Sequence, residues 1–159
     1  MLRICVLAAM TATAAGLVLG VSPGAAGDRA RIISLLSVAQ GGNLIDVDQS
    51  GGRGPTLGDQ YIFTDGLYQW QGTRRGKRVG TTHGIATITS PTTAFFTGTM
   101  SLPGGQIQGA GYFSFIAHVE TIIVLGGTGR YRNAGGDVTI TKLGGERSNN
   151  SSLVIRLVR

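Results

Sequence analysis

Residues 79–105 read VGTTHGIATITSPTTAFFTGTMSLPGG, and this stretch decides the fold class. It contains two runs rich in Thr, Ile and Phe, residues 79–89 and 92–102, which are separated by Ser90-Pro91 and followed by Pro103-Gly104-Gly105. Short runs of β-branched and aromatic residues bounded by Pro and Gly are typical of strands joined by tight turns. The stretch therefore predicts a β-hairpin that leads into a third strand.

The same pattern continues on both sides of this stretch. Further β-rich runs cover residues 30–38, 60–64, 106–115, 119–125, 137–142 and 152–158. No stretch keeps the apolar period of a helix over about ten residues. The connections suit hairpins but not the helical crossovers of parallel strands, so we expect an antiparallel sheet.

Eight antiparallel strands have two ways to bury their apolar faces. They close into an up-and-down barrel, or they divide into the two sheets of a sandwich. We predict an all-β, eight-stranded antiparallel closed barrel, because closure leaves no exposed strand edge.

The first 26 residues have the features of an export signal. Arg3 precedes an apolar run over residues 4–21, and the small residues Gly24 and Ala26 satisfy the rule for a cleavage site. The alternative is a retained membrane anchor. We predict a signal peptide over 1–26 and a single secreted domain over 27–159, without a stable membrane span after cleavage. The one cysteine, Cys5, lies in this segment, so the exported domain has no disulfide.

The chain carries a formal net charge of +6, and four cations cluster at Arg74, Arg75, Lys77 and Arg78. Such a cluster attracts nucleic acid or an anionic surface. Few aromatic residues accompany it, and we interpret it as a solvated hairpin tip. We therefore predict no nucleic-acid partner.

Two motifs suggest bound phosphate or metal, and both lack the context that such sites need. Residues 126–129, GGTG, have no expected helix after them to form a phosphate site, so we predict a turn with positive φ. Asp46 and Asp48 begin like a calcium loop, but its twelfth position is Leu57 instead of glutamate. With two histidines and no Gly-x-Ser-x-Gly motif in the chain, we predict no metal, no cofactor and no hydrolase triad.

Polar residues within the expected strands are the candidates for a site. His83 shares one strand face with Ile85, and Glu120 lies inside an apolar run beside His118. A carboxyl in apolar surroundings has a raised pKa and acts as an acid or base. The alternatives are that Glu120 pairs with an arginine or His118, or that it lies at the outer rim.

Three aromatic residues, Tyr112, Phe113 and Phe115, gather on one expected strand. Such a group either lines an apolar ligand pocket or packs in an ordinary core. Alternation alone does not decide which face points inward.

A family resemblance adds to these observations. Residues 58–68, GDQYIFTDGLY, followed by KRVG at 77–80 and Gly84-Ile85, resemble the plant allene oxide cyclases and the dirigent proteins. Both families continue with a Gly-Gly-Ser/Thr-Gly turn and a nearby aromatic residue, here residues 126–129 and Tyr131. The resemblance extends from about Ala30 to the C-terminus. It implies an eight-stranded antiparallel barrel with an apolar cavity, and a homo-oligomer.

The resemblance also implies a kind of chemistry. Allene oxide cyclases close a ring in an unsaturated fatty-acid epoxide, and dirigent proteins steer stereoselective coupling or ring closure of phenolic intermediates. Some bacterial barrels of similar shape close rings in polyketides. Asp65 falls on the second aspartate of the dirigent strand pair, but Thr64 replaces the first, and Gly135 stands where dirigent proteins carry an arginine. The first strand also lacks the glutamate of allene oxide cyclases, so neither specific activity transfers.

We predict a secreted barrel that binds an apolar, unsaturated small molecule and promotes its stereoselective cyclisation or isomerisation without a cofactor. Holding a flexible substrate in a reactive geometry supplies up to about 7 to 11 kcal/mol of a barrier. The predicted site residues are Asp65, His83, Tyr112 and Glu120. The alternatives are a non-catalytic carrier of a hydrophobic ligand, and an interaction protein whose barrel is filled by side chains.

Overall fold

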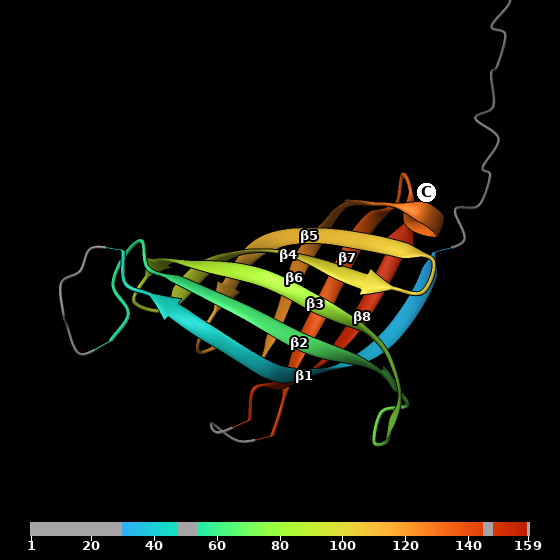
Figure 1. Ribbon diagram of the computed structural model, residues 1–159, viewed down its shortest axis with the longest axis horizontal. Helices are drawn as coiled ribbons and strands as arrows, with labels where there is room; N and C mark the ends of the chain where they lie inside the picture. The colour runs from blue at the N-terminus through green and yellow to red at the C-terminus, as the bar shows by residue number, and fades with distance from the viewer. Residues whose placement is uncertain (1–29, 48–53, 145–147, 159) are drawn as a thin grey trace, which may run out of the picture.

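The computed structural model describes residues 30–47, 54–144 and 148–158. In this part of the chain eight strands form a closed antiparallel barrel (Figure 1). The strands are β1 (Arg31–Ile45), β2 (Gln60–Trp70), β3 (Arg75–Ser90), β4 (Thr93–Leu102), β5 (Gly105–Ser114), β6 (Val119–Gly127), β7 (Gly135–Leu143) and β8 (Asn150–Val158), with a short 3-10 helix, η1 (Gly129–Tyr131), before β7. Each strand pairs with the next, and β8 pairs with β1. The prediction of a closed barrel rather than a sandwich is confirmed.

The hairpin predicted from residues 79–105 is present. The ladder between β3 and β4 runs from Thr81 opposite Ser101 to Ser90 opposite Thr93, and the one between β4 and β5 ends with Leu102 opposite Gly105. Gly104, in the second turn, has a φ of 93°, which favours glycine. Of the turn predicted at residues 126–129, Gly126 and Gly127 instead end β6, while the predicted positive φ occurs at Gly126, with 157°, and at Gly129, with 58°.

The first strand is longer than predicted. The predicted strand run ends at residue 38, but residues 40–45 continue β1 past a register shift between Ala39 and Gly41. Backbone pairing with β2 supplies their hydrogen bonds whatever their side chains are. Gly42 is required here, because a Cβ at this position would overlap the Tyr61 ring. The polar, glycine-rich composition that suggests a loop instead reflects a strand covered by an aromatic ring.

The second strand is also longer than predicted, because it runs on from Thr64 to Trp70. Asp65 therefore lies within a strand. The cluster formed by Arg74, Arg75, Lys77 and Arg78 is exposed at the hairpin between β2 and β3, as expected for a solvated tip.

The packed core lies toward one end of the barrel. Leu35 near the start of β1, Leu67 near the end of β2 and Leu157 near the end of β8 belong to one buried cluster. Antiparallel pairing brings these strand ends together. The η1 helix packs against β5 and β6 at this end and contributes Tyr131, which is 3 % exposed. Side chains thus fill this end, which we call the closed end.

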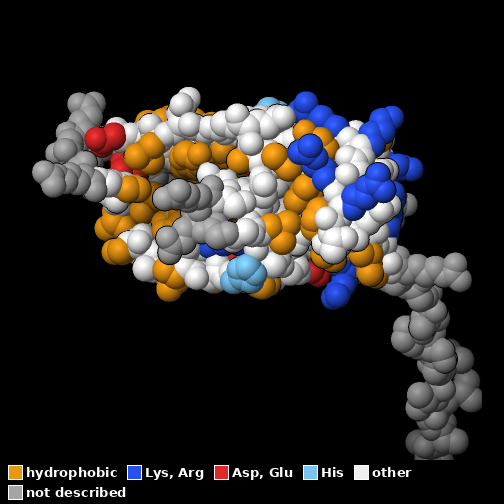
Figure 2. All heavy atoms as spheres, turned by 90° about the horizontal axis from the view of Figure 1, so that it is seen from below, with side chains coloured by type: hydrophobic (Ala, Val, Ile, Leu, Met, Phe, Trp, Pro, Cys, Tyr) orange, Lys and Arg blue, Asp and Glu red, His pale blue; other side chains and the backbone are white. Residues whose placement is uncertain are grey.

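Positively charged side chains are concentrated at the closed end of the barrel. Arginines at the closed end include Arg31, Arg130 and Arg156, which join the cluster at the β2–β3 hairpin. Figure 2 shows Lys and Arg side chains gathered toward one end of the molecule.

The predicted signal segment 1–26, with Cys5, and Asp48 of the calcium-like motif lie outside the described residues. Within the described ranges, no helix has the length and hydropathy that a membrane crossing requires.

Candidate functional site

A cavity of about 870 Å³ occupies the end of the barrel opposite the closed end. Its outer part is lined by Leu44 at the end of β1, Tyr61 at the start of β2 and Ile116 after β5. Its inner part reaches the packed core at Met100 and Leu153. A hollow of this size falls within the range of small-molecule sites, about 300 to 1,000 Å³. The described barrel is therefore not filled by its own side chains.

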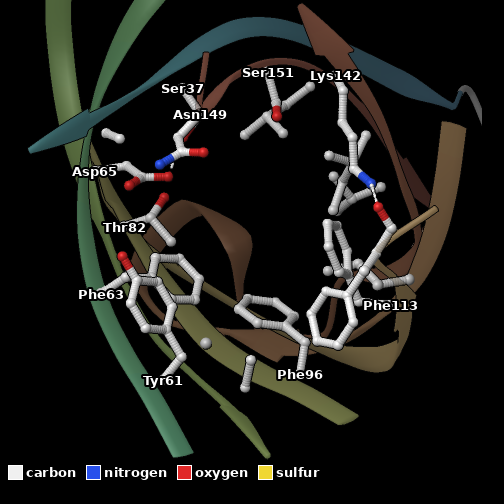
Figure 3. Close-up of a pocket in the computed structure, with 18 of the residues that line it drawn as sticks. Ser37, Tyr61, Phe63, Asp65, Thr82, Phe96, Phe113, Lys142, Asn149 and Ser151 are labelled. Carbon is white, nitrogen blue, oxygen red and sulfur yellow. Dashed lines mark hydrogen bonds between the residues drawn. The ribbon is translucent and has the colours of Figure 1, made fainter. Parts of the chain in front are cut away.

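Aromatic rings form one wall of the cavity (Figure 3). Phe63 of β2 lies between Tyr61 and Phe96, with ring centroids 6.0 and 5.7 Å away and nearly parallel planes. Phe113 of β5 extends this wall toward Lys142, whose ammonium lies 4.9 Å from its ring centroid. Such a wall offers a flat, apolar surface to an unsaturated ligand.

A row of glycines makes room for this wall. Gly84, Gly98 and Gly109 lie opposite one another on β3, β4 and β5. A Cβ at Gly84 would come within 2.6 Å of Phe96 and 2.8 Å of Phe63. The two rings therefore lie against bare backbone, and the space toward the barrel axis stays open.

Polar side chains form the opposite wall and follow neighbouring strands. Ser37 of β1 lies opposite Ser151 of β8, and Ser151 lies opposite Lys142 of β7. Asp65 of β2 lies opposite Thr82 of β3 and accepts a hydrogen bond of 2.7 Å from the Ser37 hydroxyl. All five residues line the cavity. We call Thr82, Asp65, Ser37, Ser151 and Lys142 the polar arc (Figure 3).

The Asp65 carboxyl is the acid of the polar arc. Burial raises its pKa above the ordinary value, and the hydrogen bond from Ser37 opposes this shift with a smaller effect. Ser37 occupies Oδ2. The carboxyl is therefore suited to hold a proton near a bound molecule and to donate it to a ligand oxygen.

Thr82 brings a second polar group to the same place. The residue is 7 % exposed, and its hydroxyl oxygen has no hydrogen-bond partner among the described residues. A buried polar group left without a partner costs about 1 to 3 kcal/mol. A ligand that carries an oxygen or nitrogen beside Asp65 would remove this cost.

The turn between β5 and β6 closes over one side of the cavity mouth. Glu120 accepts a hydrogen bond of 2.9 Å from the Ser114 backbone amide, and Lys142 donates to the carbonyls of Ser114 and Phe115, each at 3.0 Å. The turn carries Ile116 and His118, which both line the cavity. These contacts fix the rim.

A buried acid holds the other side of the mouth. Asp59 is 2 % exposed and accepts hydrogen bonds from the backbone amides of Val47 and Thr56, at 2.9 and 2.7 Å. It therefore ties the end of the β1–β2 connection to the residues that follow β1. Pro55, beside Thr56, lines the cavity.

The four residues predicted as a site do not come together. Asp65 lines the cavity. Glu120 lies on the same strand face as Ile122, but at the rim and bound to Ser114, which corresponds to the rim alternative. His83 is exposed and lies 3.2 Å from the Thr64 hydroxyl, and Tyr112 is 66 % exposed with its ring edge toward Phe95. The expected place of His83 and Tyr112 in the pocket is thus corrected.

The reason for this correction is the period of a strand. Thr82 and Gly84 face inward on β3, so His83 between them faces outward. Phe113 faces the cavity, so its neighbour Tyr112 points away.

Other members of the site were missed from the sequence. Ser37, Thr82 and Lys142 carry no motif, and only the inward face of each strand identifies them. The glycines within expected strands gave the one available signal, since glycine in a strand marks a close approach of another group. In the described part of the chain, no three His, Cys, Asp or Glu side chains lie close enough to hold a metal ion.

The glycine row leads to a first prediction. Gly84→Ala is expected to push the rings of Phe63 and Phe96 toward the barrel axis and to weaken binding of an aromatic fluorescent probe by about tenfold, since a displaced ring occupies ligand space. Gly41→Ala is the matched control, because Gly41 also lines the cavity and a Cβ there meets nothing within 4 Å. Equal probe affinity of the two variants, measured by titration, would contradict this account of the wall.

The raised pKa of Asp65 leads to a second prediction. The native protein binds the Asp65 proton to a higher pH than the unfolded chain, so its free energy of unfolding falls as the pH rises between the two pKa values. Both states are protonated well below the ordinary value of about 3.9, and the cost of the buried charge is complete above the native pKa. Asp65→Asn has no such cost. Its stability relative to the unsubstituted protein, measured by urea unfolding, is expected to increase from about pH 4 to about pH 7. A difference that stays constant over this range would show that the carboxyl is not desolvated.

Comparison with known proteins agrees with this architecture. Residues 44–155 match the family described as the allene oxide cyclase barrel like domain. No curated protein matches the chain. Among solved structures, a pyocyanin demethylase is 24 % identical with a TM-score of 0.66, and the similarity covers 80 % of this chain and all of that chain.

Two further structures share the fold at lower identity. A pterocarpan synthase dirigent protein is 15 % identical with a TM-score of 0.62, covering 80 % of this chain and 81 % of that chain. A Diels Alderase from Streptomyces koyangensis is 16 % identical with a TM-score of 0.64, covering 85 % of this chain and 72 % of that chain. Since the family match spans well over half of the 159 residues and covers β2 to β7 and most of β8, the chain belongs to the allene oxide cyclase barrel like family.

Proposed function

We propose that this protein binds an apolar, unsaturated small molecule in its barrel and promotes the stereoselective cyclisation or isomerisation of that molecule, with Asp65 as the acid. The observation that carries the proposal is the pairing of two walls in one cavity. Flat aromatic rings on one side fix the orientation of an unsaturated skeleton, and the polar arc on the other side holds an oxygen of the ligand.

The chemistry needs few groups. A neutral Asp65 donates its proton to a ligand carbonyl, hydroxyl or epoxide oxygen, which draws electron density from the unsaturated skeleton and favours ring closure or double-bond migration. Cyclisation and isomerisation leave the atoms and electrons of the substrate unchanged, so the proton returns to Asp65 when the product forms. The Thr82 hydroxyl, which no described residue binds, is placed to bind the same oxygen.

The shape of the cavity accounts for stereoselectivity. A ligand stacked on Phe63 and Phe96, with its oxygen at Asp65, presents one face to the aromatic wall. Holding reacting carbons in such a geometry converts part of the entropic barrier into binding. Proteins with similar barrels include a pterocarpan synthase dirigent protein and a Diels Alderase, so ring-forming chemistry is consistent with this fold. A pyocyanin demethylase has a similar barrel too, so the fold also supports other chemistry.

The test combines turnover with product chirality. Protein is incubated with polyene and epoxide candidates, and the enantiomer ratio is measured by chiral chromatography. We expect a ratio shifted from the buffer control, a rate about a hundredfold lower for Asp65→Asn because a general acid is lost, and weaker binding for Thr82→Val. His83→Asn is the matched control and should leave rate and ratio unchanged, since His83 is exposed on the outside.

Two outcomes would replace the proposal. A ligand that binds in the cavity but reacts no faster than in buffer, and gives the same enantiomer ratio as in buffer, would make the protein a carrier. Loss of activity in His83→Asn but not in Asp65→Asn would move the chemistry outside the barrel.

We further propose that the barrel acts after export, because residues 1–26 combine Arg3, an apolar run and small residues before Gly27. Expressed in full, the protein is expected in the medium or periplasm with an N-terminus at residue 27 or 28, as determined by N-terminal sequencing. Intact protein retained in the cytoplasm would contradict export without affecting the cavity chemistry.

A further inference from the structure

A lysine lies in the wall of the cavity, and no carboxylate among the described residues forms an ion pair with it. Lys142 is partly buried and lines the hollow near the end of β7. Its ammonium donates to the carbonyls of Ser114 and Phe115 and lies over the Phe113 ring. An ammonium has three donors, and the described residues use two of them. The third remains for a group inside the cavity.

The charges near Lys142 do not replace an anion. Glu120 lies along the same rim, but its carboxylate accepts from the Ser114 amide and forms no ion pair with Lys142 among the described residues. Asp65, the other acid at the cavity, has a raised pKa and is bound to Ser37 on the far side of the arc. A partly desolvated cation with a free donor favours an anionic partner.

The polar arc fixes where that partner lies relative to Asp65. Ser37 and Lys142 are two strand spacings apart through Ser151, which is on the order of 10 Å. Ser151 lies between them, and Asn149, just before β8, also lines the cavity and lies beside Asp65 (Figure 3). The aromatic wall runs along the other side of the same span.

We propose that Lys142 binds an oxyanion of the ligand, and that the substrates are anionic amphiphiles. Such a molecule carries a carboxylate or similar group at the Lys142 end and a hydrogen-bonding oxygen at the Asp65 end, joined by a flat, unsaturated skeleton; Asp65 on β2 and Lys142 on β7 are three strand spacings apart, which is on the order of 14 Å along the wall. This inference rests on the proposed function and adds to it the charge of the substrate. In this arrangement Lys142 sets the direction in which the ligand enters, and Asp65 meets its uncharged end.

The test uses two fluorescent probes of nearly equal shape, anthracene-2-carboxylate and anthracene-2-carboxamide, at neutral pH. The native protein is expected to bind the carboxylate about tenfold more tightly than the amide, because only the carboxylate forms a charge-assisted hydrogen bond with Lys142. In Lys142→Gln, which keeps a donor for the turn carbonyls, this preference should fall to about one. Lys142→Arg should retain it. Lys77→Gln is the matched control, because Lys77 is the other lysine of the chain and is exposed on β3 near the closed end.

Other results would distinguish a failure of the oxyanion site from a failure of the proposed function. Lower affinity of Lys142→Gln for both probes by the same factor, with the preference retained, would mean that Lys142 only supports the rim. Equal binding of the two probes by the native protein would overturn the oxyanion site and leave the cavity as a binding site. Failure of both probes to bind would overturn the proposed function together with this inference.

Discussion

The closure of the barrel between β1 and β8 is the constraint on which the site depends. Residues Arg31–Ser37 pair with Ser151–Leu157, and this ladder fixes which side chains of both strands face inward. A shift of one residue would turn every inward side chain outward. The native register places Ser37 beside Ser151 and directs Ser37 at Asp65, so the polar arc exists only because the last strand meets the first in this alignment.

Much of the fold was predictable because its signals are local. Strand runs, tight turns and the absence of a helical period are visible in any short window, and they gave all eight strands. What failed was the length of β1 and β2. Residues 40–45 form a strand through backbone pairing with β2, and the Tyr61 ring that covers Gly42 comes from a distant part of the sequence. The composition of residues 40–45 therefore does not indicate that Tyr61 will cover this segment.

The site was predictable only in part, because it depends on faces and not on residue types. Asp65 was found through the family resemblance. His83 and Tyr112 are as polar or aromatic as true site residues, yet each alternates with an inward neighbour and lies outside. Only the cross-strand register identifies Ser37, Thr82 and Lys142 as members of the site. This register brings together residues as far apart in the chain as β1 and β7.

The division of the barrel into a packed end and a hollow end explains how one small domain combines stability with a cavity. Leu67, Ile107 and Ile155 are fully buried in the core cluster, so the hydrophobic stabilisation is concentrated there. The hollow end can then keep features that a core would exclude. These are the desolvated acid Asp65, and a hydroxyl on Thr82 and an ammonium on Lys142 that no described residue satisfies fully. Because Ser37 and Ser151 separate Asp65 from Lys142, the two ionisable groups do not neutralise each other. A ligand that spans the arc meets a proton donor at one end and a positive charge at the other.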